Sequence, residues 1–213
     1  MMKSLIRRAA APLTTAACCA ALSSTLLLPA LGLSGCAAPA PRSSASVAPY
    51  REQIALAGRI AVHYVRDGKS ESLSGKFTWQ QTREQTDVSL ISPTGQIVAM
   101  IHVQPGLATL RENGKPPREA SDLDRLMQQA LGWSLPVSGL RDWLQGHAIA
   151  ADGSRFAASP ARDSVATRDG WKLDYLSWID DTAAVPQPKR IDVTRLGAGQ
   201  VDELSFRIVL DQE

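Results

Sequence analysis

The sequence predicts a mainly β fold: a single antiparallel curved sheet or unclosed β-barrel, with a lid of short α-helices over an apolar cavity. Three observations predict it. After residue 50, apolar and polar residues alternate with a period of two in most segments, which is typical of strands with one buried face. Short turns containing Pro or Gly separate these segments, which favours antiparallel hairpins over β-α-β units. Two stretches in the middle instead have the helical period of 3.6 residues.

The first 35 residues are predicted to be a cleaved signal peptide. Residues 1–8 are basic, the stretch 9–41 carries no charge, and leucines occupy positions 26–28. A positive start, an apolar middle and small residues at the end are typical of secretory signals. The alternative is a membrane-spanning helix, because the uncharged stretch is long enough to cross about 30 Å of hydrocarbon. Prolines, glycines and hydroxyl residues make the stretch less apolar than such a helix.

The signal ends on Leu33-Ser34-Gly35-Cys36, which resembles the lipobox of bacterial lipoproteins, where the cysteine is acylated and the chain is cut just before it. Cys36 is the only cysteine that remains without residues 1–35, and a lone cysteine cannot close a disulfide within its own chain. We therefore predict Cys36 as the lipid-attachment site. Three acyl chains, at about 0.8 kcal/mol per buried CH₂, would form a nearly permanent anchor. Ala37 in the next position favours, by the same resemblance, sorting to the outer membrane.

Residues 36–49 are predicted to be the lipidated cysteine and a flexible tether, and residues 50–213 one folded domain. Of the 13 residues in 37–49, 11 are Ala, Pro or Ser, a composition that offers little to bury. Without the three basic residues of the signal, 20 Lys and Arg stand against 21 Asp and Glu. This balance gives no support to nucleic acid as a partner. Separately, we expect the protein to be a monomer.

The first half of the domain is expected to be a meander of five strands. Alternation is clear in 73–81, where Leu73, Phe77 and Trp79 share one face. The turns Pro93-Thr94-Gly95 and Pro105-Gly106 separate later strands. The five expected strands are residues 56–66, 73–81, 88–90, 97–103 and 107–110.

Two helices are expected next, followed by further strands. Ser121 is placed to cap the first helix, whose stripe runs from Leu123 to Leu131 at helical spacing. Ser138 is placed to cap the second, in which Leu140, Trp143 and Leu144 share a face. Strands are expected to resume after Gly153, with the clearest ones at 171–175, 189–196 and 201–210, for about nine or ten strands in all.

The sequence predicts no enzyme, metal site or cofactor. His63, His102 and His147 stand apart, without the paired spacing of a metal site. No Gly-x-Ser-x-Gly motif or phosphate-binding glycine loop is present. An envelope hydrolase would need a nucleophile with a base in reach, and the sequence supplies none. The pair Asp180-Asp181 is interpreted as a solvated turn.

Apolar area is what the domain offers instead. A curved sheet under helices can enclose a cavity for apolar ligands, although any one of the tryptophans could equally be ordinary core. The residues predicted to line this acyl-chain cavity are Ile60, Val62, Phe77, Trp79, Leu90, Met100, Leu126, Leu140, Trp143 and Tyr175.

Several segments resemble, in order and spacing, the outer-membrane lipoprotein localisation family LolB. They are FTWQQ at 77–81, LISPTG at 90–95, QPGLATL at 104–110, GWSLPV at 132–137, LRDWLQG at 140–146 and GWKLDY at 170–175. The resemblance implies an unclosed antiparallel barrel with a helical lid. It also implies a receptor that takes client lipoproteins from the periplasmic carrier LolA and inserts their acyl chains into the inner leaflet of the outer membrane.

One position departs from the family pattern. The turn Pro93-Thr94-Gly95 corresponds to the family's membrane-insertion loop, which presents a leucine where this chain has Thr94. Ile97 or Val98 could take over that contact, or the segment could be a tight turn only. The alternative function is a structural or interaction lipoprotein that docks another envelope protein, and an interior filled by the protein's own side chains would favour it.

Overall fold

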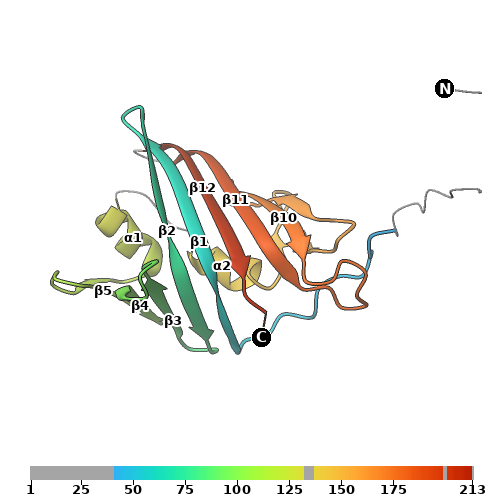
Figure 1. The fold of residues 1–213 in the computed structure, drawn as a ribbon, viewed down its shortest axis with the longest axis horizontal. Coiled ribbons are helices and arrows are strands. Elements are labelled where there is room, and N and C mark those ends of the chain that lie inside the picture. Colours follow the sequence, from blue (N-terminus) through green and yellow to red (C-terminus); the bar gives the residue numbers. More distant parts are fainter. Residues whose placement is uncertain (1–40, 132–136, 199–200, 213) are drawn as a thin grey trace, which may run out of the picture. The chain divides into compact units, whose positions relative to one another are not determined.

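The computed structural model describes residues 41–131, 137–198 and 201–212, which all fall in one compact unit, Pro39–Glu213. Within these residues, ten strands form one antiparallel sheet in the order β6-β5-β4-β3-β2-β1-β12-β11-β10-β9. The sheet is strongly curved and does not close, since β6 and β9 form its two edges (Figure 1). The predicted fold class is therefore confirmed. The predicted signal peptide, Cys36 and residues 132–136 of the GWSLPV segment lie outside the described residues.

The strands of the first half are β1 (Ile54–Arg66), β2 (Lys69–Gln81), β3 (Thr86–Ile91), β4 (Ile97–Gln104), β5 (Leu107–Glu112) and β6 (Arg118–Ala120). The helices are α1 (Leu123–Leu131) and α2 (Val137–Trp143). The remaining strands are β7 (His147–Ile149), β8 (Arg155–Ala157), β9 (Ser164–Ala166), β10 (Lys172–Trp178), β11 (Pro188–Ala198) and β12 (Val201–Leu210). The sequence did not predict β6 to β9, because three residues are too few for alternation to be visible.

The first and last strands meet in the middle of the sheet. β1 pairs with β12, and Val62 lies opposite Phe206. β1 also pairs with β2 over the full length of both strands, from Ile54 opposite Gln81 to Arg66 opposite Lys69. Both helices lie on one side of this sheet (Figure 1). The concave face is therefore the buried face, as the alternation of apolar residues along β1, β2 and β12 requires.

Gly58 allows β1 to pass close to its neighbours. A Cβ atom at Gly58 would lie 2.3 Å from the carbonyl oxygen of Val209 and 2.9 Å from Cε1 of Phe77. Neither separation is possible for real atoms, so a side chain at this position would push β1 away from β12. The close approach of β1 to β12 at this point therefore depends on this glycine.

We expect Gly58→Ala to lower the free energy of unfolding by about 1–3 kcal/mol, because the added methyl group meets backbone that cannot move aside. Urea unfolding followed by tryptophan fluorescence measures this change. Ala57→Ser is the control, since Ala57 is the exposed neighbour on the same strand and surface changes stay within about 0.5 kcal/mol. Equal midpoints for the two variants would contradict the close approach.

An aromatic core fills the part of the concave side under β10 to β12. The Trp171 ring lies between those of Trp143 and Phe206, with centroids 6.0 and 5.7 Å away. Tyr175 stacks on Phe156 and donates a hydrogen bond of 3.1 Å from its hydroxyl to the carbonyl oxygen of Trp143. This core holds α2 against the sheet.

Residues 42–48, here called the strap, are bound to the domain rather than free. The Val47 side chain is buried, and its backbone N–H donates to the carbonyl oxygen of Ala158 at 2.9 Å. Ser43 donates its N–H to the carbonyl oxygen of Asp181 at 2.9 Å. The composition of residues 37–49 predicted a flexible tether instead, because Ala, Pro and Ser bury little. Backbone hydrogen bonds do not depend on side chains, and Val47 packs onto Gly146, which has no side chain to obstruct it.

Candidate functional site

An apolar cavity of about 380 Å³ lies on the concave side, between the sheet and the helices. Strands β1, β2, β3, β4 and β12 form its floor, and residues of α1 and α2 form its roof. Ser74, Lys76 and Ser92 are the lining residues with polar side chains. The remaining lining is hydrocarbon, so the cavity suits an apolar ligand.

Strand alternation and register build the floor. Ile60 and Val62 are two residues apart on β1 and point to the same face. On β2, Phe77 lies opposite Leu90 of β3, so that both contribute to one wall. Gly75 lies opposite Ile60 and lets β3 approach closely, because a Cβ atom there would lie 2.6 Å from the carbonyl oxygen of Ile91. The floor of the cavity therefore follows from the register of the strands and from the face on which each places its large apolar residues.

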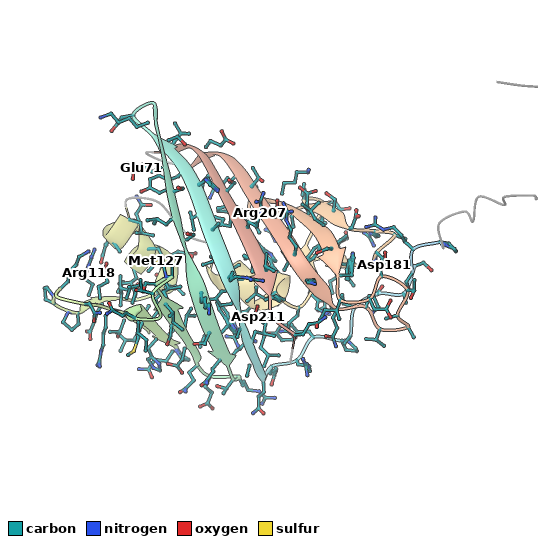
Figure 2. The ribbon with its side chains drawn as sticks, viewed as in Figure 1. Glu71, Arg118, Met127, Asp181, Arg207 and Asp211 are labelled. Atoms are coloured by element: carbon teal, nitrogen blue, oxygen red, sulfur yellow. The ribbon has the colours of Figure 1, made fainter. Side chains whose placement is uncertain are left out.

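The roof consists of the apolar stripe of α1 together with leucines of α2 and of the segment directly after it. Met127 and Leu131 line the cavity from α1, and Figure 2 places Met127 on the helix-covered side of the sheet. Leu140 of α2 and Leu144 just beyond it complete the roof. α1 begins differently from the prediction, because Asp122 rather than Ser121 caps it. Oδ1 of Asp122 accepts the backbone N–H of Arg125 at 2.8 Å, and this bond lowers the pKa of the Asp122 carboxyl.

Six of the ten residues predicted to line the cavity are lining residues in the structure. They are Ile60, Val62, Phe77, Trp79, Leu90 and Leu140. Phe206, Val88 and Met127 line it as well and were not predicted. The alternation of the last strand indicates that Phe206 lies on a buried face. Its place in the cavity depends on the pairing of β12 with β1, and a local pattern does not specify which strands pair.

Met100 lies on the opposite face of the sheet. It is 42% exposed, whereas the next residue, Ile101, is buried and lines the cavity. The prediction for Met100 is thus off by one position, and such a shift exchanges the two faces of a strand. Leu126, Trp143 and Tyr175 are buried in the core and do not line the cavity. Trp143 and Tyr175 belong to the aromatic core, which fills the concave side where β10 and β11 cross it.

The cavity opens beside an apolar rim. Leu73 at the rim is 54% exposed, and Val98 of β4, which also lines the cavity, is 42% exposed. Ile97 next to it is exposed as well. Pro93, at the start of the turn between β3 and β4, lines the same opening. Exposed aliphatic residues around an apolar opening are typical of a contact with lipid or with another apolar surface.

The turn Pro93-Thr94-Gly95 is a tight reverse turn. The N–H of Gly95 donates to the carbonyl oxygen of Ser92 at 2.9 Å, and Gly95 has a φ of 87°, which favours glycine. The hydroxyl groups of Thr94 and Ser92 lie 2.8 Å apart and share a hydrogen bond. This bond within the turn reduces the need of the Thr94 hydroxyl for water. The exposed Thr94 can therefore leave water at a lower cost than a free hydroxyl.

The titratable groups with shifted pKa near the helices lie outside the cavity lining. Burial raises the pKa of Tyr175 well above its usual range, and the nearby Asp142 carboxylate adds to the rise. Partial burial likewise raises the pKa of Asp142. Among the described residues, no three His, Cys, Asp or Glu side chains come together in a way that could hold a metal ion. None of the described helices is both long and apolar enough to span a bilayer.

Comparisons with known proteins identify relatives along most of the chain. Residues 52–212 match the model of the family described as Outer membrane lipoprotein LolB. A protein of Cupriavidus metallidurans named Outer-membrane lipoprotein LolB is 37% identical over 188 residues, which are 86% of this chain and 91% of that protein. Its namesake in Ralstonia nicotianae is 39% identical over 161 residues, covering 73% and 77% of the two chains. Its namesake in Thiobacillus denitrificans is 37% identical over 187 residues, covering 85% and 91%.

Among solved structures, a DUF1329 family protein from Desulfovibrio piger aligns with a TM-score of 0.40 and 10% identity, over 75% of this chain and 85% of that one. This likeness is too low to carry an argument about fold or function. The family match, in contrast, covers nearly the whole described domain. The resemblance seen in the sequence segments is thereby confirmed. The chain belongs to the LolB family of outer-membrane lipoproteins, and the outer membrane is its location.

Proposed function

We propose that this protein is an outer-membrane-anchored receptor that accepts lipoproteins from the periplasmic carrier LolA and inserts them into the inner leaflet of the outer membrane. The observation that carries the proposal is the apolar cavity of about 380 Å³ that opens beside an exposed aliphatic rim. Cys36 is the proposed lipid-attachment site. In the alternative, an interaction lipoprotein that docks another envelope protein, this interior space would have no use.

The cavity supplies the driving force that such a transfer needs. Hydrocarbon gains about 0.8 kcal/mol per CH₂ when it leaves water, so one long acyl chain is worth on the order of 10 kcal/mol. A lipoprotein can therefore cross the periplasm only with its acyl chains covered. A receptor that binds the chains more tightly than the carrier, beside a bilayer that binds them still more tightly, moves them by differential affinity alone.

The position of the rim supports the proposed insertion of acyl chains into the bilayer. Leu73 and Val98 lie at the opening of the cavity, and Ile97 extends the exposed apolar surface next to the turn Pro93-Thr94-Gly95. An acyl chain that leaves the cavity here would pass along aliphatic side chains and not through water. We propose that this rim, including the turn, is the part of the domain that contacts the bilayer during insertion.

A transfer experiment with the lipidated full-length protein tests the proposed function. LolA loaded with a radiolabelled lipoprotein is mixed with vesicles that carry the receptor or with empty vesicles, and the vesicles are then floated. We expect the label to move into the floated fraction only with the receptor. Retention of the label on LolA in both samples, with the receptor present and folded, would contradict the proposal.

Thr94→Leu is expected to strengthen the membrane contact of the turn. The substitution replaces a hydroxyl group with hydrocarbon at an exposed position, and the gain should be about 1–2 kcal/mol of partition free energy, or roughly a fivefold to thirtyfold higher vesicle partition coefficient. Vesicle flotation of the unlipidated domain measures it. Gln85→Leu is the matched control and should partition as the wild type does, because Gln85 is exposed in the turn between β2 and β3, at the other end of the sheet. An unchanged partition coefficient for Thr94→Leu would show that the turn does not meet lipid.

A further inference from the structure

The bound strap limits how far the domain can stand from its anchor. Residues 42–48 lie against the body, and Arg42 forms an ion pair of 3.1 Å with Asp163. Arg42 is the sixth residue after Cys36, and six extended residues span about 20 Å at most. This step rests on the proposed function, because it takes Cys36 to be the residue held in the membrane. The part of the surface around Arg42 must then lie close to the bilayer.

Three exposed aliphatic side chains lie on that part of the surface. We call Leu176, Ile179 and Val185 the loop patch; they belong to the end of β10 and to the β10–β11 loop, and their exposed fractions are 47%, 37% and 53%. Leu176 and Ile179 line one surface hollow together with Arg42.

Leu176 and Val185 are both turned outward by specific features of the chain. Leu176 lies on the outer face of β10 by simple alternation, because Leu173 and Tyr175 on the other face are buried. It is also the extra residue of a β-bulge, since Tyr175 and Ser177 pair with the consecutive residues Ile191 and Arg190 of β11. Val185 precedes Pro186, which is fully buried and fixes the loop. The patch is therefore presented by ordered backbone and is not the tip of a loose loop.

The strap holds this loop directly. The Ser43 hydroxyl donates to the carbonyl oxygen of Ala183 at 3.0 Å, and the Ser43 N–H donates to that of Asp181 at 2.9 Å. The chain that leads to the anchor thus leaves the domain at the β10–β11 loop itself. Figure 2 shows Asp181 at the opposite end of the domain from Arg118 of β6.

The loop patch is distinct from the rim of the cavity. In the sheet order, β2, β1, β12 and β11 lie between β3 and β10. Because neighbouring strands are antiparallel, β3 and β10 run in opposite directions. The turn after β3 and the loop after β10 therefore leave opposite ends of the sheet. Contact of the rim with the bilayer does not bring the loop patch to the bilayer as well.

We propose that the loop patch is a second membrane-contact surface, which seats the domain on the bilayer that holds its own anchor. The driving force is apolar. The loop carries Asp180 and Asp181, and Lys189 follows it, so the local charge does not attract the anionic lipids that draw basic segments to membranes. The contact should therefore be insensitive to salt, unlike a contact made by basic residues.

Depth measurement with a spin label tests this proposal in the lipidated full-length protein. Acylation occupies the thiol of Cys36, so a single added cysteine can be labelled. We compare Val185→Cys with Glu119→Cys, which is exposed on the edge strand β6, away from the loop patch. In vesicles, the ratio of oxygen to nickel-complex collision rates should rise several-fold for the label at position 185. It should stay at its aqueous value for the label at position 119, at both low and high salt.

The outcomes separate this inference from the proposed function. A label at position 185 that remains as accessible to the nickel complex in vesicles as in the unlipidated protein would overturn the inference, even if lipoprotein transfer is normal. A label within the bilayer would support it, even if transfer fails. A second measurement uses a spin label at Ile179→Cys, with and without the additional substitution Val185→Asp. The added charge should move this label from the bilayer into water, while the free energy of unfolding in urea stays unchanged.

Discussion

Val62→Asp is expected to abolish apolar ligand binding while the domain remains folded. Val62 lines the cavity from β1 and is only half-buried. An ionised carboxylate in this hydrocarbon lining loses its hydration when a ligand covers it, so the affinity for an apolar probe should fall by about a hundredfold or more. The stability cost should be about 1–2 kcal/mol, because the carboxylate keeps access to water while the cavity is empty.

Titration with an apolar fluorescent probe and urea unfolding measure the two effects separately. The matched control is His63→Asp, which introduces the same carboxylate at the adjacent residue, on the exposed face of β1. We expect His63→Asp to bind the probe as the wild type does. Lowering the pH below the pKa of the new aspartate should restore part of the binding by Val62→Asp, because the neutral acid is less costly in hydrocarbon. Equal binding by both variants at neutral pH would contradict the cavity as the ligand site.

Cys36→Ser is expected to abolish acylation and to leave an uncleaved precursor. Serine has no thiol to carry the diacylglycerol, and the lipobox-dependent cleavage then does not take place. We expect no incorporation of radiolabelled palmitate, and an uncleaved precursor on gels. The effect on acylation is all or none, because the chain has no other cysteine after the predicted signal peptide.

The control for this experiment is Ser34→Ala. With alanine in place of Ser34, the segment around Cys36 still resembles a lipobox, so processing and acylation should be normal. Normal cleavage of Cys36→Ser, or palmitate incorporation elsewhere in the chain, would contradict the assignment of the anchor. A block in both variants would show that the segment is not read as a lipobox.

Local patterns predicted the elements that are long enough to repeat. Apolar residues alternate from Leu73 to Trp79 in β2 and from Leu204 to Leu210 in β12, and α1 has a stripe over more than two helical turns. In such elements every residue adds to the same periodic signal, so the type of element and its buried face are both visible. The three-residue strands β6 to β9 carry too little repetition to be recognised, although they include the edges of the sheet.

The cavity was predictable in kind but only partly in detail. Ile60, Phe77 and Trp79 lie on well-alternating faces and line the cavity. Met100 was assigned to the wrong face, because β4 is apolar on both sides and its pattern does not distinguish them. Trp143 has the large apolar side chain expected of a lining residue, yet Trp171 packs against it and Trp143 is buried in the core.

The sequence by itself determined the family, the mainly β class, the helical lid and the cysteine proposed for acylation, because short motifs and periodicity are local properties of the chain. Only the tertiary structure decided three further features: which apolar residues surround empty space, the binding of residues 42–48 to the body, and the grouping of Leu176, Ile179 and Val185 beside them. Each of these depends on distant segments that meet in space. Backbone hydrogen bonds and strand order control such meetings, and neither leaves a local trace in side-chain composition.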